Sequence, residues 1–175
     1  EKNAVGVNIL LHGPPGVGKT QLASVLAREA GAPLYSARER TDDPYLLPDR
    51  TESLALAQAL APRGRSLLLF DEMEDVFSRQ SDWFFSRDYK ANVSKMFLVD
   101  LLEKNAVPTV WCSNVVDGID PALLRRFSYA IEMRKPGARR RAAVLLKHAG
   151  EHAVDASTAQ RLAERSAASP GQMAQ

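Results

Sequence analysis

The chain has 175 residues, 45% of them hydrophobic and 25% charged, which is typical of a globular protein with a sizeable core. Its formal net charge of +2 is too small to indicate nucleic-acid binding by itself. No apolar run approaches membrane-spanning length and no signal peptide opens the chain, so we expect no membrane contact. Because the chain begins without Met and ends inside a predicted helix, we expect it to be a module of a longer protein.

The stretch at residues 13–20 fits the pattern G-x-x-x-x-G-K-[ST], which is typical of a phosphate-binding loop. A short apolar run at 9–11 predicts a strand before it, and apolar residues at helical spacing predict a helix behind it. Backbone N–H groups of such a loop, with the positive end of the helix dipole, bind phosphate. We expect Lys19 to reach the β- and γ-phosphates of a nucleotide and Thr20 to place its hydroxyl on Mg²⁺.

The next segment alternates between short structured stretches and breaks. Residues 34–37 are predicted to form a second strand, and the polar stretch 38–48 with its two prolines a loop. Asp49 and Glu52 have capping-box spacing, so a helix is expected from there to about Ala61, where a Pro-Arg-Gly sequence ends it.

Residues 66–70 form an apolar run without alternation, as in a parallel strand covered on both faces. Asp71 and Glu72 follow at its carboxyl end, which is where ligands of open α/β sheets bind. Asp71 can hold the Mg²⁺ shell, and Glu72 can act as a general base on the attacking water. The alternative is two acids that merely end a strand, and their pairing with a phosphate loop favours the site.

Together, residues 13–20 and 67–72 resemble the Walker A and Walker B motifs of the AAA+ ATPases. In chain order, later segments resemble the family's sensor-1 strand, arginine-finger segment and lid-helix start: 109–114, 120–127 and 169–172. The resemblance covers nearly the whole chain. It implies an α/β fold of the P-loop NTPase, AAA+ type, with a five-stranded parallel sheet flanked by helices and a partial helical lid. The strands would be about 8–12, 33–37, 66–71, 108–114 and 129–133.

The resemblance also implies a nucleotide site that binds ATP and Mg²⁺. The expected nucleotide contacts are Gly13, Pro14, Pro15, Gly16, Val17, Gly18, Lys19, Thr20 and Gln21. Thr20 and Asp71 would hold the metal, and Glu72 would be catalytic. Asn114 would orient the attacking water, the alternative being a turn residue at a strand end.

Two arginines compete for the role of the finger that completes a neighbour's site. Arg126 precedes Phe127, as the finger usually does in this family, and Arg125 is the second candidate. The segment lacks the Pro-Gly spacer found between two arginines in the best-known branch, so the two roles stay open. The alternative is solvated arginines at a helix end. A finger of this kind implies a ring, expected to be a hexamer.

Two loops would face the central pore of such a ring. The first, 38–48, carries Tyr45 without the Gly that usually accompanies a substrate-gripping aromatic. The second, 78–92, contains Trp83-Phe84-Phe85 and Tyr89 among charged residues. This aromatic group is expected either to fold back on the core, which we favour, or to contact a substrate or a neighbour.

The C-terminal third is predicted to be helical. A helix at 93–103 would bury Val93, Phe97, Leu101 and Leu102, and residues 134–137 would form a linker. We therefore place a nucleotide-binding domain at 1–134 and a truncated lid at 135–175.

Two helices are expected in this lid. The basic run 139–141 opens one and is interpreted as a solvated face rather than a nucleic-acid site. Asp155 caps another, which extends to about Arg165, and the remaining residues contain no arginine for a sensor-2 role.

Cys112 is the one cysteine and lies in a predicted buried strand, which is consistent with a reducing, cytoplasmic location. The favoured function is ATP hydrolysis between subunits of a ring, coupled to remodelling of an unidentified protein client. The alternatives are a slowly hydrolysing ATP-dependent assembly switch and a nucleic-acid remodeller or loader.

Overall fold

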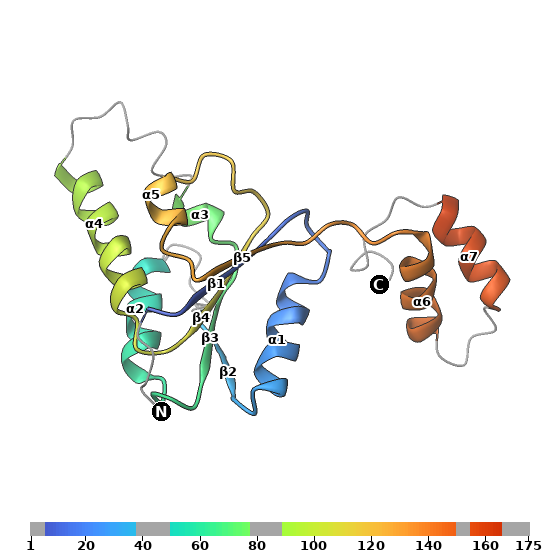
Figure 1. Cartoon of the computed structure of the whole chain (residues 1–175), viewed down its shortest axis with the longest axis horizontal. Coiled ribbons are helices and arrows are strands. Elements are labelled where there is room, and N and C mark those ends of the chain that lie inside the picture. Colours follow the sequence, from blue (N-terminus) through green and yellow to red (C-terminus); the bar gives the residue numbers. More distant parts are fainter. Residues whose placement is uncertain (1–5, 38–49, 78–88, 150–154, 166–175) are drawn as a thin grey trace, which may run out of the picture.

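The computed structural model describes residues 6–37, 50–77, 89–149 and 155–165. Within these residues the chain forms a five-stranded parallel sheet in the order β2-β3-β4-β1-β5, flanked by helices (Figure 1). The strands are β1 (Asn8–His12), β2 (Leu34–Ser36), β3 (Leu67–Phe70), β4 (Thr109–Ser113) and β5 (Tyr129–Glu132). The predicted fold class is confirmed, and each predicted strand agrees with the structure to within one residue at either end.

The helices of the described residues lie between and after these strands. They are α1 (Lys19–Glu29), α2 (Arg50–Leu60), α3 (Glu74–Phe77), α4 (Tyr89–Lys104), α5 (Pro121–Leu124), α6 (Ala138–Ala149) and α7 (Ala156–Arg165). None of these helices is long and apolar enough to cross a membrane.

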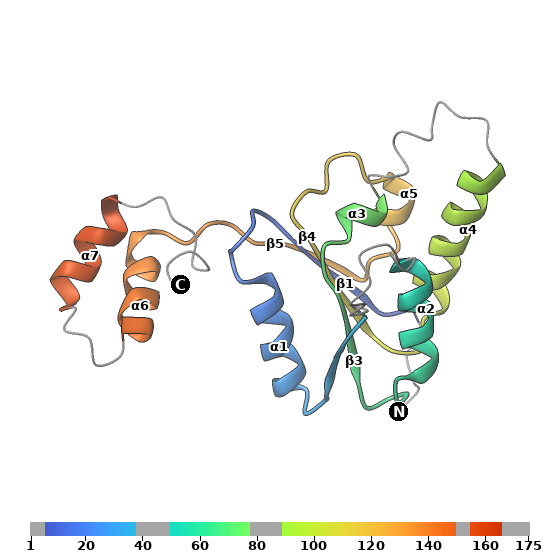
Figure 2. The same ribbon diagram turned by 180° about the vertical axis from the view of Figure 1, so that it is seen from behind.

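The central strands of the sheet are covered on both faces, and their successive residues, which point to opposite sides, pack in two separate cores. In β3, Leu68 and Phe70 pack in a core with residues of α2, α4 and α5, whereas Leu69 packs in a second core with Ala23 of α1. Figures 1 and 2 show α1 on one side of the sheet and α2 and α4 on the other. The run of apolar residues without alternation in β3 follows from this burial on both faces.

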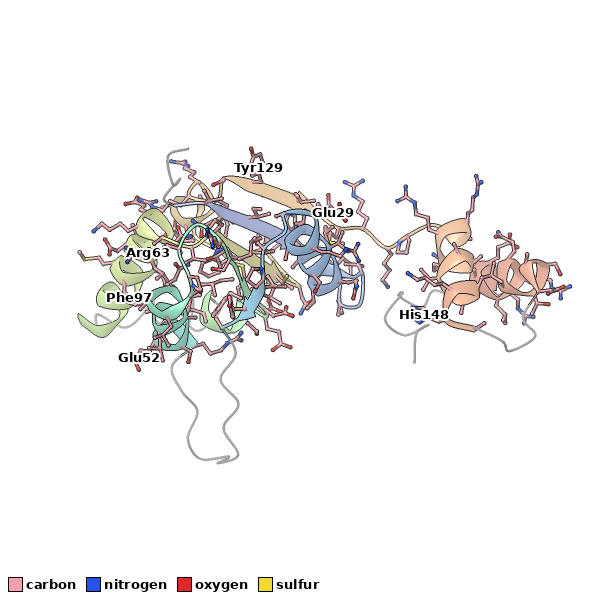
Figure 3. The ribbon with its side chains drawn as sticks, turned by 90° about the horizontal axis from the view of Figure 1, so that it is seen from below. Glu29, Glu52, Arg63, Phe97, Tyr129 and His148 are labelled. Atoms are coloured by element: carbon pink, nitrogen blue, oxygen red, sulfur yellow. The ribbon has the colours of Figure 1, made fainter. Side chains whose placement is uncertain are left out.

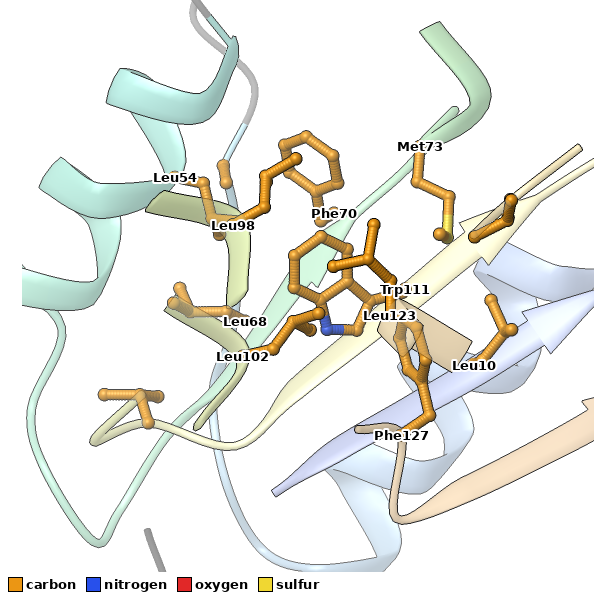
Figure 4. Close-up of a cluster of buried hydrophobic side chains, with 13 residues drawn as sticks. Leu10, Leu54, Leu68, Phe70, Met73, Leu98, Leu102, Trp111, Leu123 and Phe127 are labelled. Atoms are coloured by element: carbon orange, nitrogen blue, oxygen red, sulfur yellow. The ribbon is translucent and has the colours of Figure 1, made fainter. Parts of the chain in front are cut away.

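Trp111 of β4 lies at the centre of the larger core and is fully buried (Figure 4). Its ring meets Phe70 edge-on at 5.0 Å and Phe127 at 5.8 Å between centroids. The indole Nε1–H donates to Asn8 Oδ1 at 2.9 Å, and Asn8 Nδ2 donates to the Leu102 carbonyl at 2.7 Å. A buried polar pair therefore ties β4, β1 and α4 together without an unsatisfied group between them.

α4 differs from the sequence prediction in its start and in its buried face. It begins at Tyr89, so the end of the predicted loop 78–92 is helical, consistent with the absence of Pro and Gly between residues 89 and 105. Leu98 and Leu102, one helical turn apart, are buried, whereas Phe97 is 40% exposed (Figure 3). The predicted core face is therefore confirmed at Leu102, and Leu101 packs against the same core, but the prediction is wrong at Phe97, because the position of the sheet selects the buried stripe.

α6 and α7 pair with each other at the far end of the linker that follows β5, apart from the sheet (Figures 1 and 2). Ala142, Ala159 and Ala163 form their small core. The prediction that residues 139–141 are all solvated needs correction. Arg141 turns inward and donates from Nη2 to the Ala163 carbonyl in the last turn of α7 at 2.7 Å, where helix carbonyls lack partners within the helix.

Two smaller predictions about the lid and the sheet are confirmed. Asp155 caps α7 by accepting a hydrogen bond from the Thr158 N–H at 2.8 Å, and Cys112 is fully buried in β4. Burial raises the pKa of the Cys112 thiol to about 12, so it is a core group and not a reactive one.

Candidate nucleotide-binding site

The predicted phosphate loop leaves the carboxyl end of β1 and turns into α1. Gly13 has φ 142°, its N–H donates to the Ser113 carbonyl at 3.2 Å, and a Cβ there would lie 2.0 Å from the Met133 carbonyl oxygen. Gly18, at φ 99°, caps α1 without a side-chain hydrogen bond. No side chain at the cap therefore occupies the N–H groups of the first turn of α1. These groups, with the positive end of the helix dipole, can bind an anion.

Lys19 is nearly buried, at 7% exposure, beneath the loop. Its Nζ donates to the Gly13 carbonyl at 2.7 Å, the Pro14 carbonyl at 3.0 Å and Asn114 Oδ1 at 2.8 Å. Burial lowers the pKa of Lys19, and the nearby Cys112, Asp71 and Glu74 oppose that effect. The ammonium group is thus fixed at the point where the loop, β1 and β4 meet.

Thr20 and Asp71 meet at the same edge of the sheet. Thr20 Oγ1 donates to Asp71 Oδ2 at 2.8 Å, so a hydroxyl and a carboxylate from segments distant in sequence lie in contact. Such oxygen ligands suit Mg²⁺, which completes its shell with water and nucleotide phosphates. No group of three or more His, Cys, Asp or Glu side chains that could hold a metal occurs among the described residues.

Asn114 follows β4 and is held at both ends of its side chain. Its Oδ1 accepts from Lys19, and its Nδ2 and backbone N–H both donate to the carboxylate of Glu74. Ser113 Oγ also donates to Glu74, at 3.0 Å. Burial opposes the charge on Glu74, but these hydrogen bonds, with one from its own backbone, outweigh it and lower the pKa of Glu74.

Glu72 is exposed and has φ 56°, in the left-handed region. Its N–H donates to Asp71 Oδ1 at 3.0 Å. Arg50, the first residue of α2, donates to the carbonyls of Asp71 and Glu72 and lies over the Phe70 ring at 4.9 Å from its centroid. The turn after β3 is therefore held from both sides while the Glu72 carboxylate stays accessible.

Sequence reasoning missed two of these residues. Glu74 had a signal, because it is a third acid two positions after Glu72, shortly after the same strand. Arg50 had none, since twenty-one residues separate it from Asp71 and only the packing of α2 beside β3 brings them together.

The two candidate finger arginines differ in their surroundings. Arg126 is half-buried, and its Nε pairs with Glu103 Oε1 of α4 at 2.7 Å while Nη1 donates to the Ala122 carbonyl. Arg125 is exposed. Both follow α5, which begins with Pro121 after an Asp120 cap. The predicted loop 38–48, most of the second loop (78–88) and the lid-helix start at 169–172 lie outside the described residues.

A parallel sheet of this order, with a phosphate loop after β1 and acids after β3, defines a P-loop nucleotide-binding protein. The family model "ATPase family associated with various cellular activities (AAA)" matches residues 9–135. The chain therefore belongs to this AAA family of ATPases.

Similar proteins agree with this assignment. An ATP-dependent zinc metalloprotease FtsH 3 of Sphaerobacter thermophilus is 32% identical over 147 residues, covering 81% of this chain and 30% of that protein. The ATPase family gene 2 protein homolog B of Rattus norvegicus is 36% identical over 153 residues, covering 81% of this chain and 20% of that protein. A proteasome-activating nucleotidase 2 of Halobacterium salinarum is 29% identical over 160 residues, covering 85% of this chain and 39% of that protein.

The fold has a solved counterpart. The crystal structure of the FIGL-1 AAA domain in complex with ADP matches with a TM-score of 0.70 at 20% identity, covering 96% of this chain and 57% of that one. The chain spans between a fifth and two fifths of the length of the relatives named above.

Proposed function

We propose that this protein binds ATP with Mg²⁺, hydrolyses it between the subunits of a ring, expected to be a hexamer, and couples hydrolysis to remodelling of a protein client. The observation that carries the proposal is the meeting of Lys19, Thr20, Asp71 and Asn114 beyond the carboxyl ends of β1, β3 and β4. Proteases and a proteasome-activating nucleotidase among the similar proteins support a protein client.

Binding of the nucleotide falls to the loop and the first turn of α1. Loop N–H groups and Lys19 Nζ would contact phosphate oxygens, which compete with the carbonyls that Lys19 now uses. Thr20 Oγ1 and Asp71 Oδ2 would hold Mg²⁺. The metal supplies neutralisation of charge on the phosphates.

Hydrolysis falls to residues at the ends of β3 and β4. Glu72 would take a proton from the water that attacks the γ-phosphorus, while the bond from that phosphorus to the bridging oxygen breaks and ADP leaves. Asn114 would orient the attacking water. Asn114 is suited to this role because Lys19 and Glu74 fix which end of its amide carries the donor. Positioning of this kind is the main contribution a protein makes to phosphoryl transfer.

An arginine of the neighbouring subunit would complete the site. Exposure favours Arg125, because Arg126 is engaged by Glu103 within its own chain. That ion pair is partly exposed, with 30% and 50% of the side chains accessible, and such pairs are worth only about 0–1 kcal/mol. A neighbour's phosphates would thus be able to displace Glu103, and Arg126 stays a candidate.

A slowly hydrolysing assembly switch is the second candidate. The observation that bears on it is the Arg126–Glu103 pair, which engages a candidate finger within its own subunit. Nucleic-acid remodelling gains no support from the lid. Arg141 turns inward, which leaves Arg139 and Arg140 as the exposed part of the basic run.

The test is the dependence of turnover on assembly and on client. We expect ATPase activity per subunit to rise with protein concentration, and an unfolded protein to stimulate it. Slow turnover that rises with assembly but ignores unfolded protein would instead support the switch. Activity per subunit that stays flat down to the monomer would overturn hydrolysis between subunits.

A further inference from the structure

We propose that Arg50 is a positioning residue for hydrolysis, which acts by holding the Asp71–Glu72 turn in the conformation that presents the Glu72 carboxylate. This inference rests on the proposed role of Glu72 as the general base. Arg50 is the first residue of α2 and is half-buried against the end of β3. It lies outside both the phosphate loop and the strand that carries the acids.

Arg50 contacts the backbone carbonyls of the two acids. Its Nη1 donates to the Glu72 carbonyl at 2.9 Å, and its Nη2 donates to the neighbouring Asp71 carbonyl. The guanidinium also lies 4.9 Å from the centroid of the Phe70 ring, the last residue of β3. The planar fork of an arginine matches two adjacent acceptors and an aromatic face at once, which a lysine cannot do.

The turn at Glu72 needs stabilising contacts because the backbone conformation of Glu72 is unfavourable. Among the described residues it is the non-glycine residue with a positive φ, 56°. Side chains disfavour this region, so it persists only where the surrounding structure fixes it, and such residues cluster at active sites. The turn is fixed at its N–H groups by Asp71 Oδ1 and, for Met73, by the Cys112 carbonyl at 3.0 Å. Arg50 supplies the hold on the carbonyl side.

Loss of this hold should move the carboxylate of Glu72 while the phosphate loop stays unchanged. The loop is fixed by other contacts, those of Gly13 and Lys19. Arg50→Lys keeps the charge and the helix start but removes the double hydrogen bond. Since misplacement of a catalytic group by about 1 Å costs about 100-fold in rate, we expect kcat to fall about 10- to 100-fold with the Kd for ATP within about twofold of the parent.

The decisive experiment is a double-mutant cycle with Glu72→Gln, measured as kcat together with the Kd for ATP. If Arg50 acts through Glu72, Arg50→Lys should lower kcat in the parent background but change it by less than about threefold in the Glu72→Gln background. Arg63→Ala, at an exposed arginine beyond the other end of α2 (Figure 3), is the matched control and should leave kcat and Kd unchanged.

The outcomes separate this inference from the proposed function. Equal losses of kcat in both backgrounds, or a weakened Kd for ATP, would overturn the positioning role of Arg50. So would a parental kcat in Arg50→Lys when Glu72→Gln is slow. If Glu72→Gln itself turns over at the parental rate, the proposed role of Glu72 fails first, and the inference about Arg50 falls with it. Unfolding by urea, measured on every variant, distinguishes a loss of folding from a weakened Kd for ATP.

Discussion

Lys19 Nζ donates a hydrogen bond to Asn114 Oδ1 at 2.8 Å, joining the first residue of α1 to the residue after β4. The cation that is expected to meet the phosphates and the amide that is expected to orient water are thus one connected unit. A change at Lys19 removes the cation, whereas a change at the Glu74 end of the unit acts on the amide.

Lys19→Ala should weaken ATP binding. A charge-assisted hydrogen bond to phosphate is worth roughly 1.5–3 kcal/mol, or about 10- to 150-fold in affinity. Calorimetric titration with ATP measures the effect. Lys104→Ala is the control, because Lys104 is exposed and pairs with Asp100 on the surface of α4. Unchanged affinity in Lys19→Ala would mean that the loop is not a phosphate site.

Glu72→Gln should separate hydrolysis from binding. The variant keeps the shape of the side chain but removes the base, and loss of a general base typically slows turnover about 10²–10⁴-fold. Phosphate release is measured alongside ATP affinity, which should be retained. Glu52→Gln, at an exposed acid of α2 (Figure 3), should behave as the parent does. Asp71→Ala should instead weaken the dependence of turnover on Mg²⁺.

The central strands β1, β3 and β4 were predictable because each is a short, mostly apolar run, and burial on both faces removes alternation. The placement of residues 13–20, Asp71, Glu72 and Asn114 at one edge was predictable because all of them follow strand ends, which parallel topology brings together. Local sequence is sufficient for such features.

Features that depend on packing between distant segments were not predictable. The buried stripe of α4 is set by where the sheet lies, so Leu98 replaced Phe97 as a core residue. The positions of Arg50 over the Asp71–Glu72 turn and of Arg126 against Glu103 depend on pairs far apart in sequence. No pattern in a single sequence specifies such pairs.

Glu74→Gln should lower stability at neutral pH by about 1–2 kcal/mol, less than for a fully buried charge because the carboxylate is half-exposed. Its pKa is lowered in the folded protein, since hydrogen bonds outweigh burial. A depressed pKa stabilises the fold fully above the unfolded value of about 4.3, and this stabilisation is lost as pH falls through the folded pKa.

Urea denaturation across a pH series measures the difference between the parent and Glu74→Gln. We expect a constant difference above about pH 5.5 that shrinks as pH falls below about 4.3. A difference that grows on acidification would contradict the assignment of a charged Glu74 as the acceptor for Asn114 and Ser113.

Trp111→Phe should destabilise the domain core. The substitution leaves Asn8 Oδ1 without its indole donor, and a buried unsatisfied acceptor costs about 1–3 kcal/mol before the cavity adds to it. The free energy of unfolding by urea is the measurement. Tyr129→Phe, at an edge-strand residue that is 66% exposed (Figure 3), should change stability by less than about 0.5 kcal/mol. Equal effects of the two changes would mean that Trp111 is not the centre of the core.

The last prediction decides between the two arginines. A finger supplied by a neighbouring subunit is worth about 10³–10⁵ in turnover, so its loss should leave ATP binding intact and abolish most hydrolysis. If Arg126 serves only its own chain, Arg126→Ala and Glu103→Gln should each keep turnover near the parental rate, and Arg125→Ala should lose it. If Arg126 is the finger, Arg126→Ala should be inactive, whereas Glu103→Gln, which frees it, should not.

Mixing subunits then tests whether the arginine acts across an interface. The inactive arginine variant still supplies a phosphate loop, and Lys19→Ala still supplies both arginines, so mixed rings contain interfaces with an intact pair. We expect turnover of the mixture to exceed that of either variant alone. A second mixture, of Lys19→Ala with Glu103→Gln, serves as the reference for how far the subunits exchange between rings. Without recovery at any ratio in rings that demonstrably exchange subunits, the arginine does not complete a neighbour's site. If neither arginine affects turnover, hydrolysis is completed within one chain and the ring proposal fails.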